Sequence, residues 1–350
     1  MRRIAMRPVG LLAVAALAAA ALAGCSSSGS GGASGSASGT QALTLYNGQH
    51  EQTTDALVAA FTKDTGIKVN VRSDDEDVLA NQIEAEGSHA PADLFYTENS
   101  PALMQLQNKN LLVPVDKSAL AQVPAQYDSP QGDWLGVSAR VSVLIYNTKM
   151  LTPAQLPTTL AQLADPQWKG KLGLAQGETD FQPIVTSMVK SQGVAATKTW
   201  LNAVKNNAGS NLYPDNETLT SMVDSGKAAI GIINQYYWYR LKAENKGAVN
   251  SAIASFAPKD PGYVLDVSGA GILASSKHQA EAQKFIAFLG SAEAQKIIAT
   301  SDSFEYPIGS GVTTAQPETP FDQLKPTDLS VADLGDGSQA ITLLQQAQLL

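Results

Sequence analysis

Apolar and polar positions follow two distinct rhythms from about residue 41 onward. Short runs that are continuously apolar, or that alternate strictly, predict β-strands, whereas longer stretches with apolar residues three and four positions apart predict amphipathic helices. Strands are expected at 43–46, 67–71, 93–96, 141–146, 171–175, 228–233 and 264–274. Helices are expected at 51–65, 78–86, from Pro101 onward, and at 181–191, 195–206, 217–224, 236–244, 278–289 and 292–300. Strands separated by helices in this way predict an α/β protein built on an open sheet.

Two residues that suit helix starts support this assignment. Pro101 fits a first helical turn, and either Asp215 or Asn216 is a plausible cap for the helix expected at 217–224.

The pattern contains two such series, and the strand at 264–274 leads the chain back to the first. We therefore expect an α/β fold of two lobes, joined by a hinge and separated by a cleft. The expected limits are 41–140 for the first part of lobe 1, 141–266 for lobe 2, 267–315 for the return to lobe 1, and 316–350 for a C-terminal segment that packs on lobe 2.

The first 24 residues have the features of a bacterial lipoprotein signal peptide. Arg2, Arg3 and Arg7 form a basic head, an apolar run rich in alanine covers 11–22, and Leu22-Ala23-Gly24-Cys25 matches a lipobox. The apolar run is shorter than the roughly 20 strongly apolar residues that a membrane span needs. The sequence thus predicts an extracytoplasmic protein anchored to the cell membrane through a lipid on Cys25.

Residues 25–40 are expected to form the lipidated cysteine and a tether, since 26–39 contain almost only Ser, Gly and Ala. Cys25 is the single cysteine of the chain, which excludes disulfides and thiolate metal sites. The formal net charge is −8, which argues against nucleic acid as a partner and weakly favours cations.

Four side chains with oxygen or nitrogen donors stand at the ends of predicted strands. His50 follows the first strand, Glu98 follows the third, and Tyr236 and Tyr237 lie where a strand gives way to a helix. Carboxyl ends of strands form the ligand-binding edge of an open α/β sheet. An imidazole, a carboxylate and two phenols suit a hard, highly charged ion such as Fe³⁺. Only a strongly acidic metal displaces the proton of a phenol, whose pKa is about 10.

Each of these residues alone has an ordinary interpretation. The tyrosines could be part of an aromatic surface cluster, His50 could be a structural hydrogen-bonding residue, and Glu98 could cap the helix that starts at Pro101. Their combination favours a metal site. His89 and His278 have no other donors near them in the sequence and are expected to be solvated.

No sequence feature of a hydrolase is present. The chain lacks a Gly-x-Ser-x-Gly motif, and Thr54 stands where a zinc protease would need its second histidine. We therefore do not expect an enzyme; an anchored hydrolase and a structural or adhesive lipoprotein are the alternatives from other classes.

Several motifs resemble those of the ferric-ion-binding proteins of bacterial ABC iron importers, which are solute-binding lipoproteins of the periplasmic-binding-protein class. The motifs are Leu45-Tyr46-Asn47-Gly48-Gln49-His50, Asp93-Leu94-Phe95-Tyr96-Thr97-Glu98, Asn234-Gln235-Tyr236-Tyr237-Trp238 and Ser303-Phe304-Glu305-Tyr306-Pro307. The resemblance implies a type II two-lobed fold, with His50, Glu98, Tyr236 and Tyr237 as ligands of Fe³⁺. It also implies a monomer that receives ferric ion or a small ferric chelate and delivers it to a permease.

The same resemblance implies that an exogenous anion, phosphate or carbonate, completes the iron coordination. Asn216 and Asn234 match anion-contacting asparagines, Asn99 stands where glutamine is common, and Arg140 matches an arginine near the cleft. The chain departs from the family pattern at one loop.

That loop is Gly177-Glu178-Thr179-Asp180, where the family usually has Ser-Gly-Ala. Its two carboxylates would repel a phosphate. Either Glu178, Thr179 and Asp180 hold the anion differently, or one of the two carboxylates replaces it, or the loop is solvated; the last is the expectation. The alternative function within the same fold is a receptor for a polyamine, thiamine or an organic anion.

Overall fold

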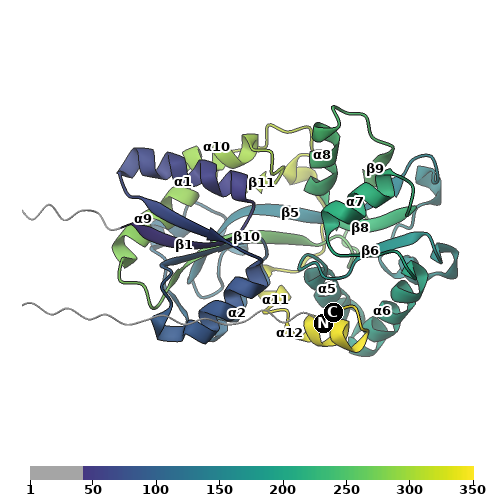
Figure 1. The fold of residues 1–350 in the computed structure, drawn as a ribbon, viewed down its shortest axis with the longest axis horizontal. Helices are drawn as coiled ribbons and strands as arrows, with labels where there is room; N and C mark the ends of the chain where they lie inside the picture. Colours follow the sequence, from purple (N-terminus) through teal and green to yellow (C-terminus); the bar gives the residue numbers. More distant parts are fainter. Residues whose placement is uncertain (1–41) are drawn as a thin grey trace, which may run out of the picture. The chain divides into compact units, whose positions relative to one another are not determined.

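An 11-stranded mixed sheet runs through the part of the chain that the computed structural model describes, residues 42–350 (Figure 1). Its strands follow the order β2-β1-β3-β10-β5-β8-β6-β7, with β4, β9 and β11 paired at the side. The strands are β1 (Leu43–Gly48), β2 (Val69–Ser73), β3 (Leu94–Thr97), β4 (Leu112–Val113), β5 (Trp134–Asn147), β6 (Leu172–Ala175), β7 (Leu212–Tyr213), β8 (Ile230–Asn234), β9 (Ser251–Ala254), β10 (Leu265–Leu273) and β11 (Tyr306–Pro307). The signal peptide 1–24, the Cys25 anchor and the tether to residue 40 lie outside the described residues.

Helices cover the sheet on both faces. They are α1 (Glu51–Thr65), α2 (Glu76–Glu86), α3 (Ser100–Asn108), α4 (Lys117–Leu120), α5 (Phe181–Gln192), α6 (Val194–Ala208), α7 (Asn216–Asp224), α8 (Gln235–Glu244), α9 (Gln279–Leu289), α10 (Ala292–Thr300), α11 (Val331–Leu334) and α12 (Ser338–Gln346). Among residues 42–350, no helix combines the length and apolar character needed to cross a membrane.

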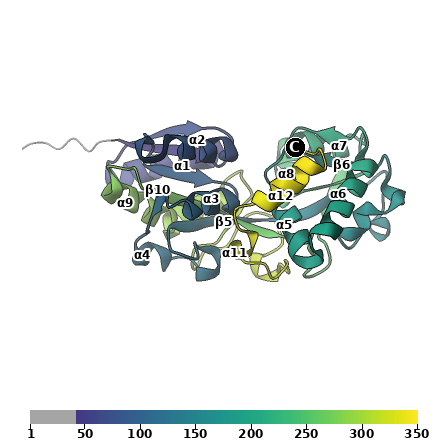
Figure 2. The ribbon, with the colours of Figure 1, turned by 90° about the horizontal axis from the view of Figure 1, so that it is seen from below.

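Two lobes share this sheet (Figures 1 and 2). Lobe 1 contains β1 to β4, β10 and β11 with α1 to α4, α9 and α10, and lobe 2 contains β6 to β9 with α5 to α8. In lobe 1, β1 pairs in parallel with both β2 and β3, so the carboxyl ends of these strands meet at one edge. The predicted α/β, two-lobed fold is confirmed.

The buried strand β5 connects the lobes. Residues 134–141 pair antiparallel with β10 in lobe 1, and residues 142–146 pair antiparallel with β8 in lobe 2. All of its positions are buried. The sequence predicted only 141–146 as a strand, because Gly136, Ser138 and Arg140 interrupt the apolar pattern before that point.

The apolar stripe of α1 shows how the cores form. Leu57 and Phe61 are fully buried, and the Phe61 ring centroid lies 5.0 Å from that of Phe285 in α9. Gly66 ends the helix with φ 73°, a left-handed conformation that glycine adopts without a Cβ clash.

The C-terminal segment contacts both lobes. α12 packs on α5 of lobe 2, as Figure 2 shows, and Lys205 Nζ donates to the carbonyl of Ala347 at 2.8 Å. α11, which precedes it, touches α3 of lobe 1 as well as α5. The sequence pattern predicted neither of these short helices.

Local predictions had mixed outcomes. Asp215 does cap α7, because its carboxylate accepts from Thr218 N at 2.6 Å. β2 begins two residues later than expected. The expectation that His278 is solvated was wrong: it is half-buried, and its Nδ1 lies 3.0 Å from Asp93 Oδ1.

We predict that Gly136→Ala lowers the free energy of unfolding by about 1–3 kcal/mol, the usual cost of overpacking. A Cβ at this position of β5 would lie 2.2 Å from the carbonyl oxygen of Tyr127, which is backbone and cannot rotate away. Urea unfolding followed by circular dichroism measures the change.

Gly290→Ala is the matched control, because there the added methyl meets only side chains, Gln122 at 3.2 Å and Leu135 at 3.4 Å, and φ is −79°. Its expected effect is below about 1 kcal/mol. Equal midpoints for the two variants would contradict the crowding at Gly136.

Candidate metal centre

His50 and Glu98 leave the same edge of the sheet in lobe 1. His50 lies two residues after β1, Glu98 directly follows β3, and Gly48 pairs with Thr97 in the parallel register. The two side chains are only 9% and 15% exposed, and His50 Nδ1 lies 2.7 Å from Glu98 Oε1. The other ring nitrogen, Nε2, is buried and has no hydrogen-bond partner in the described residues.

Tyr236 and Tyr237 come from the first turn of α8 in lobe 2, directly after β8. At a helix start, adjacent side chains diverge by about 100°, so both can lean toward one region. Their ring centroids are 4.2 Å apart, and both rings are buried. The ring of Tyr236 also stands edge-on to His50, with centroids 5.0 Å apart. The structure thus brings the four predicted donors together from two lobes.

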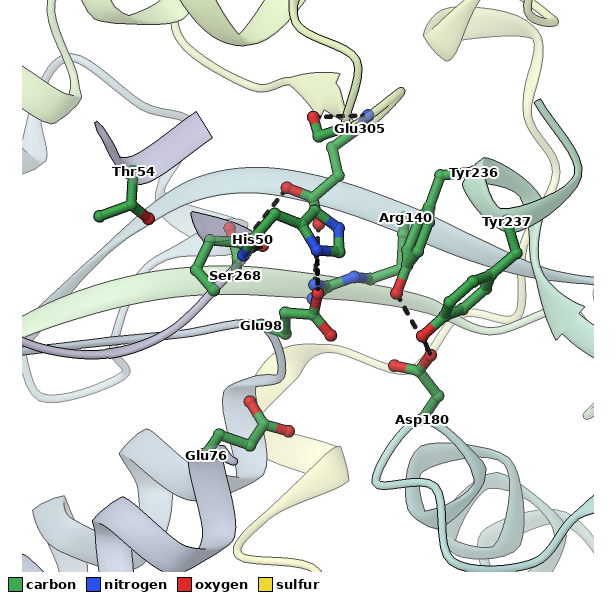
Figure 3. Close-up of polar contacts among 12 residues, drawn as sticks. His50, Thr54, Glu76, Glu98, Arg140, Asp180, Tyr236, Tyr237, Ser268 and Glu305 are labelled. Carbon is green, nitrogen blue, oxygen red and sulfur yellow. Dashed lines mark hydrogen bonds and ion pairs between the residues drawn. The ribbon is translucent and has the colours of Figure 1, made fainter. Parts of the chain in front are cut away.

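The two phenols share one acceptor, the carboxylate of Asp180 (Figure 3). Tyr236 Oη donates to Asp180 Oδ2 at 3.3 Å, and Tyr237 Oη donates to the same oxygen at 3.1 Å. Asn216 Nδ2 also donates to Oδ2, at 3.1 Å, and Asn99 Nδ2 donates to Oδ1 at 3.0 Å. Because Asn99 belongs to lobe 1, this last bond joins the lobes.

The expectation of a solvated loop at residues 177–180 was wrong for Asp180. Its side chain is buried, since phenols and amides replace water around the carboxylate. Glu178 is half-buried and accepts from the backbone N–H of Asn216 at 2.8 Å, and Thr179 Oγ1 lies 3.4 Å from Asn99 Nδ2. The two carboxylates of the loop therefore have different surroundings.

Arg140 lies on β5 beneath the site and is fully buried. Its Nη2 donates to Glu305 Oε1 at 2.8 Å, while Nε and Nη1 have no partner in the described residues. Glu305 Oε2 in turn accepts from Gln49 Nε2 and from Ser138 Oγ. Arg140 thus forms a buried ion pair. Asn234 lines a small cavity together with Asp180 and Asn216.

The sequence analysis did not identify Arg240. Its guanidinium lies 5.4 Å from the ring centroid of Tyr236 and 5.8 Å from that of Tyr237, and Nη2 is 3.4 Å from His50 Nδ1. The helical spacing could have predicted this contact. Side chains three and four positions apart on a helix are neighbours, and Arg240 follows Tyr237 by three residues and Tyr236 by four.

Glu76 is a second residue that was not identified. Its buried carboxylate accepts from the backbone and side-chain N–H groups of Asn99, both at 2.8 Å, and from Thr97 Oγ1. It fixes the segment that carries Glu98.

Burial determines the protonation of the donors. It raises the pKa of both phenols well above the ordinary value, and the charge of Asp180 raises it further. Burial also raises the pKa of Glu98, with a further contribution from Asp180, and lowers the pKa of His50 to about 4. The metal-free site therefore holds neutral phenols and a neutral imidazole at pH 7.

Carboxylates dominate the cavity that leads to these donors. Its volume is about 740 Å³. The acidic residues that line it come from both lobes: Glu51, Asp74, Asp75, Glu76, Asp77, Glu98, Glu178, Asp215 and Glu217. His50 and Arg240 are its basic lining residues. A cleft lined by one sign of charge concentrates counter-ions, here cations. Within residues 42–350, no three His, Cys, Asp or Glu side chains converge at metal-binding spacing, and the donor group described here includes two tyrosines.

Comparisons with known proteins agree with this architecture. A family model described as bacterial extracellular solute-binding protein matches residues 47–296. The Fe(3+)-binding periplasmic protein of Serratia marcescens is 39% identical over 315 residues, which cover 90% of this chain and 92% of that protein. The crystal structure of iron-bound HitA from Pseudomonas aeruginosa superposes with a TM-score of 0.84 at 41% identity, covering 87% of this chain and 99% of that one. A Trichodesmium protein (IdiA, FutA) in complex with iron and citrate has a TM-score of 0.76 at 29% identity, covering 89% of this chain and 100% of that one.

We predict that Glu305→Gln lowers the free energy of unfolding by about 3–5 kcal/mol, because it leaves the charge of Arg140 buried without a counter-ion. Asp328→Asn is the control: it breaks the exposed Lys259–Asp328 pair and should cost less than about 1 kcal/mol. Chemical denaturation of both variants measures the difference. An unchanged midpoint for Glu305→Gln would contradict the role of this ion pair.

Proposed function

The chain belongs to the family of bacterial extracellular solute-binding proteins, alongside its ferric-ion-binding receptors, and we propose that it captures Fe³⁺ between its lobes and delivers it to an ABC transporter permease. As a member of this family it is a binding protein and not an enzyme. The convergence of two buried phenols, a carboxylate and an imidazole from two lobes is the observation that carries the proposal.

His50, Glu98, Tyr236 and Tyr237 are the proposed protein ligands. Three of them offer oxygen, the donor that a hard trivalent cation prefers, and His50 Nε2 is a buried nitrogen with no other partner in the described part of the chain. The phenols hold their protons in the metal-free state, so an ion must be strongly acidic to bind them. Fe³⁺ meets this requirement, whereas the divalent cations that bind oxygen ligands, such as Ca²⁺ and Mg²⁺, are weaker acids.

The proposal includes an anionic oxygen donor at the remaining coordination position. It is either an exogenous anion, phosphate or carbonate, or a carboxylate of the chain itself. Asn99, Asn216 and Asn234 surround this position, while Glu305 already pairs with Arg140. The similarity to the Trichodesmium protein that holds iron with citrate supports a site that accommodates such a donor.

Iron would act as a bridge between the lobes. Lobe 1, formed by residues 41–140 and 267–315, supplies His50 and Glu98. Lobe 2, formed by residues 141–266 with the segment 316–350 against them, supplies both tyrosines. Because only the closed form offers all of these donors to one ion, iron stabilises closure by differential affinity. A lipid on Cys25 would keep the closed, loaded protein near the permease.

We predict that replacing Tyr236 and Tyr237 together by Phe abolishes the visible tyrosinate-to-iron charge-transfer band. Iron affinity should fall on the order of 100-fold or more, because loss of residues that only support metal ligands already lowers metal affinity about 10–100-fold. Absorption spectroscopy and competition with a chelator measure both effects. Tyr239→Phe is the control on the same helix, because Tyr239 stacks on Phe304 and should leave colour and affinity unchanged. A double variant that keeps its colour would refute the ligand assignment.

We also predict that iron binding at pH 7.5 releases about two protons per ion, because both phenols are protonated in the metal-free protein. The sign follows from the raised pKa values: protons compete with the metal, so affinity rises with pH and falls on acidification. Because the pKa of His50 is about 4, protons compete with iron for the imidazole only in acidic solution. A pH-stat titration, corrected for protons from the iron donor, gives the number. Release of less than one proton per ion would contradict phenolate ligation.

A further inference from the structure

We propose that Glu76 is a positioning residue for iron binding: it holds the backbone on both sides of Glu98 and directs the amide of Asn99 across the cleft. This inference rests on the proposed function and deepens it. Glu76 belongs to α2, a helix that supplies none of the proposed ligands. Figure 3 shows it below Glu98 and apart from the tyrosines, so its effect on the metal passes through the segment at residues 97–99.

The hydrogen bonds of Glu76 lie on both sides of Glu98. Its Oε2 accepts from Thr97 Oγ1 and from the backbone N–H of Asn99, the latter at 2.8 Å. Its Oε1 accepts from Asn99 Nδ2, also at 2.8 Å. The residue is only 5% exposed, so little water competes for these bonds. Thr97 and Asn99 are therefore fixed to one carboxylate, and Glu98 between them keeps mainly the freedom of its own side chain.

Glu76 also lies against the strand that leads to His50. A Cβ built on Gly48 would be 2.6 Å from Glu76 Cβ and 2.8 Å from Glu76 Cα, so this approach requires glycine. Gly48 ends β1, two residues before His50, and pairs with Thr97 at the end of β3. The start of α2 thus packs against the ends of both strands that present the lobe 1 ligands.

A single amide connects Glu76 to lobe 2. Asn99 Nδ2 donates to Glu76 Oε1 at 2.8 Å and to Asp180 Oδ1 at 3.0 Å, so its two N–H groups serve carboxylates of opposite lobes. Turning this amide over would place its oxygen between two carboxylates, and the charges on either side therefore determine its orientation. Without Glu76 the amide loses one of these two acceptors, and the contact between the lobes weakens.

Contacts, and not charge alone, distinguish Glu76 from its neighbour Asp77. Asp77 follows it on α2, lines the same acidic cavity and has the same kind of side chain. It is exposed, and its carboxylate accepts from the backbone N–H of Val78. Asp77 attracts cations to the cavity without holding residues 97–99, which makes it a matched control.

The rate of iron release tests the proposal. Full-length wild type, Glu76→Gln, Asn99→Ala, the double variant and Asp77→Asn are loaded with ferrous chloride and air in a buffer that contains phosphate, so that an external anion is not limiting. The pH is about 8, because burial raises the pKa of Glu76 to about 7 and its carboxylate must be ionised. Bound iron, the charge-transfer band, the rate of iron loss to a chelator and the unfolding midpoint of the metal-free protein are measured.

Glu76→Gln should bind one iron and keep the wild-type band, because both tyrosines remain. It should lose iron about 10–100-fold faster, the usual effect of removing a group that supports metal ligands. Asp77→Asn should stay within about threefold of the wild-type rate, since solvent and salt screen an exposed charge. The effects of Glu76→Gln and Asn99→Ala should not multiply in the double variant, because both changes break the same contact.

Glu76→Gln with a lower unfolding midpoint but the wild-type rate of iron loss would reveal a purely structural role and overturn the inference. Equal acceleration in Glu76→Gln and Asp77→Asn, or effects that multiply in the double variant, would overturn it as well. If Glu76→Gln does not fold, Thr97→Val takes its place: it removes one donor to Glu76 without a change of charge, and it should release iron faster than the wild type. A wild type that binds no ferric ion would instead refute the proposed function, which is a separate result.

Discussion

The burial of acidic groups at the junction of two lobes is the constraint on which the rest of this structure depends. Two phenols, Glu98 and Asp180 lie within a shared, poorly hydrated region, and carboxylates that are unpaired in such surroundings would be costly. The protein meets this cost with hydrogen bonds rather than with solvent. Asp180 receives two phenol and two amide donors, and Arg140 is held in place by Glu305. The elements that carry these groups are strand ends and helix starts, where the backbone is fixed by the sheet.

If iron binds as proposed, this arrangement makes the metal-free site a hydrogen-bonded mimic of the loaded one. Protons occupy the spaces between oxygens that a small, highly charged ion would occupy, so binding becomes an exchange of protons for metal. The acidic lining of the cavity favours the approach of a cation, while Arg240 and Arg140 limit the repulsion among the donors. In the proposed mode of binding, selectivity for a strongly acidic ion follows from the raised pKa of the phenols and not from cavity size alone.

Much of the fold could be predicted from the sequence, because most helices and strands are long enough to show their periodicity. The limits of α1 and α10 were predicted to the residue, and β8 followed by α8 placed both tyrosines at a helix start. His50 and Glu98 were placed at one edge of the sheet by strand order alone. The short elements β4, β7, β9, β11, α4 and α11 were not predicted, because so few residues carry too little pattern; α12 was also missed, although it is as long as α10. The Arg140–Glu305 pair and the direction of Asp180 depend on contacts between residues far apart in the sequence, which no local pattern encodes.

The strand β5 runs from one lobe into the other and constrains how the lobes are joined. β5 and β10 are paired along their length from Trp134 to Val141, with one register shift between Ser268 and Gly269, and β5 then continues into lobe 2 beside β8. A continuous ladder resists sliding, because a slip of one residue would turn every side chain to the opposite face. The register of this part of β5 is therefore fixed in lobe 1, and the same strand continues into lobe 2 beside β8. Because β8 leads directly to Tyr236 and Tyr237, the continuous backbone of β5 also sets how the two tyrosines face His50 and Glu98 across the lobes.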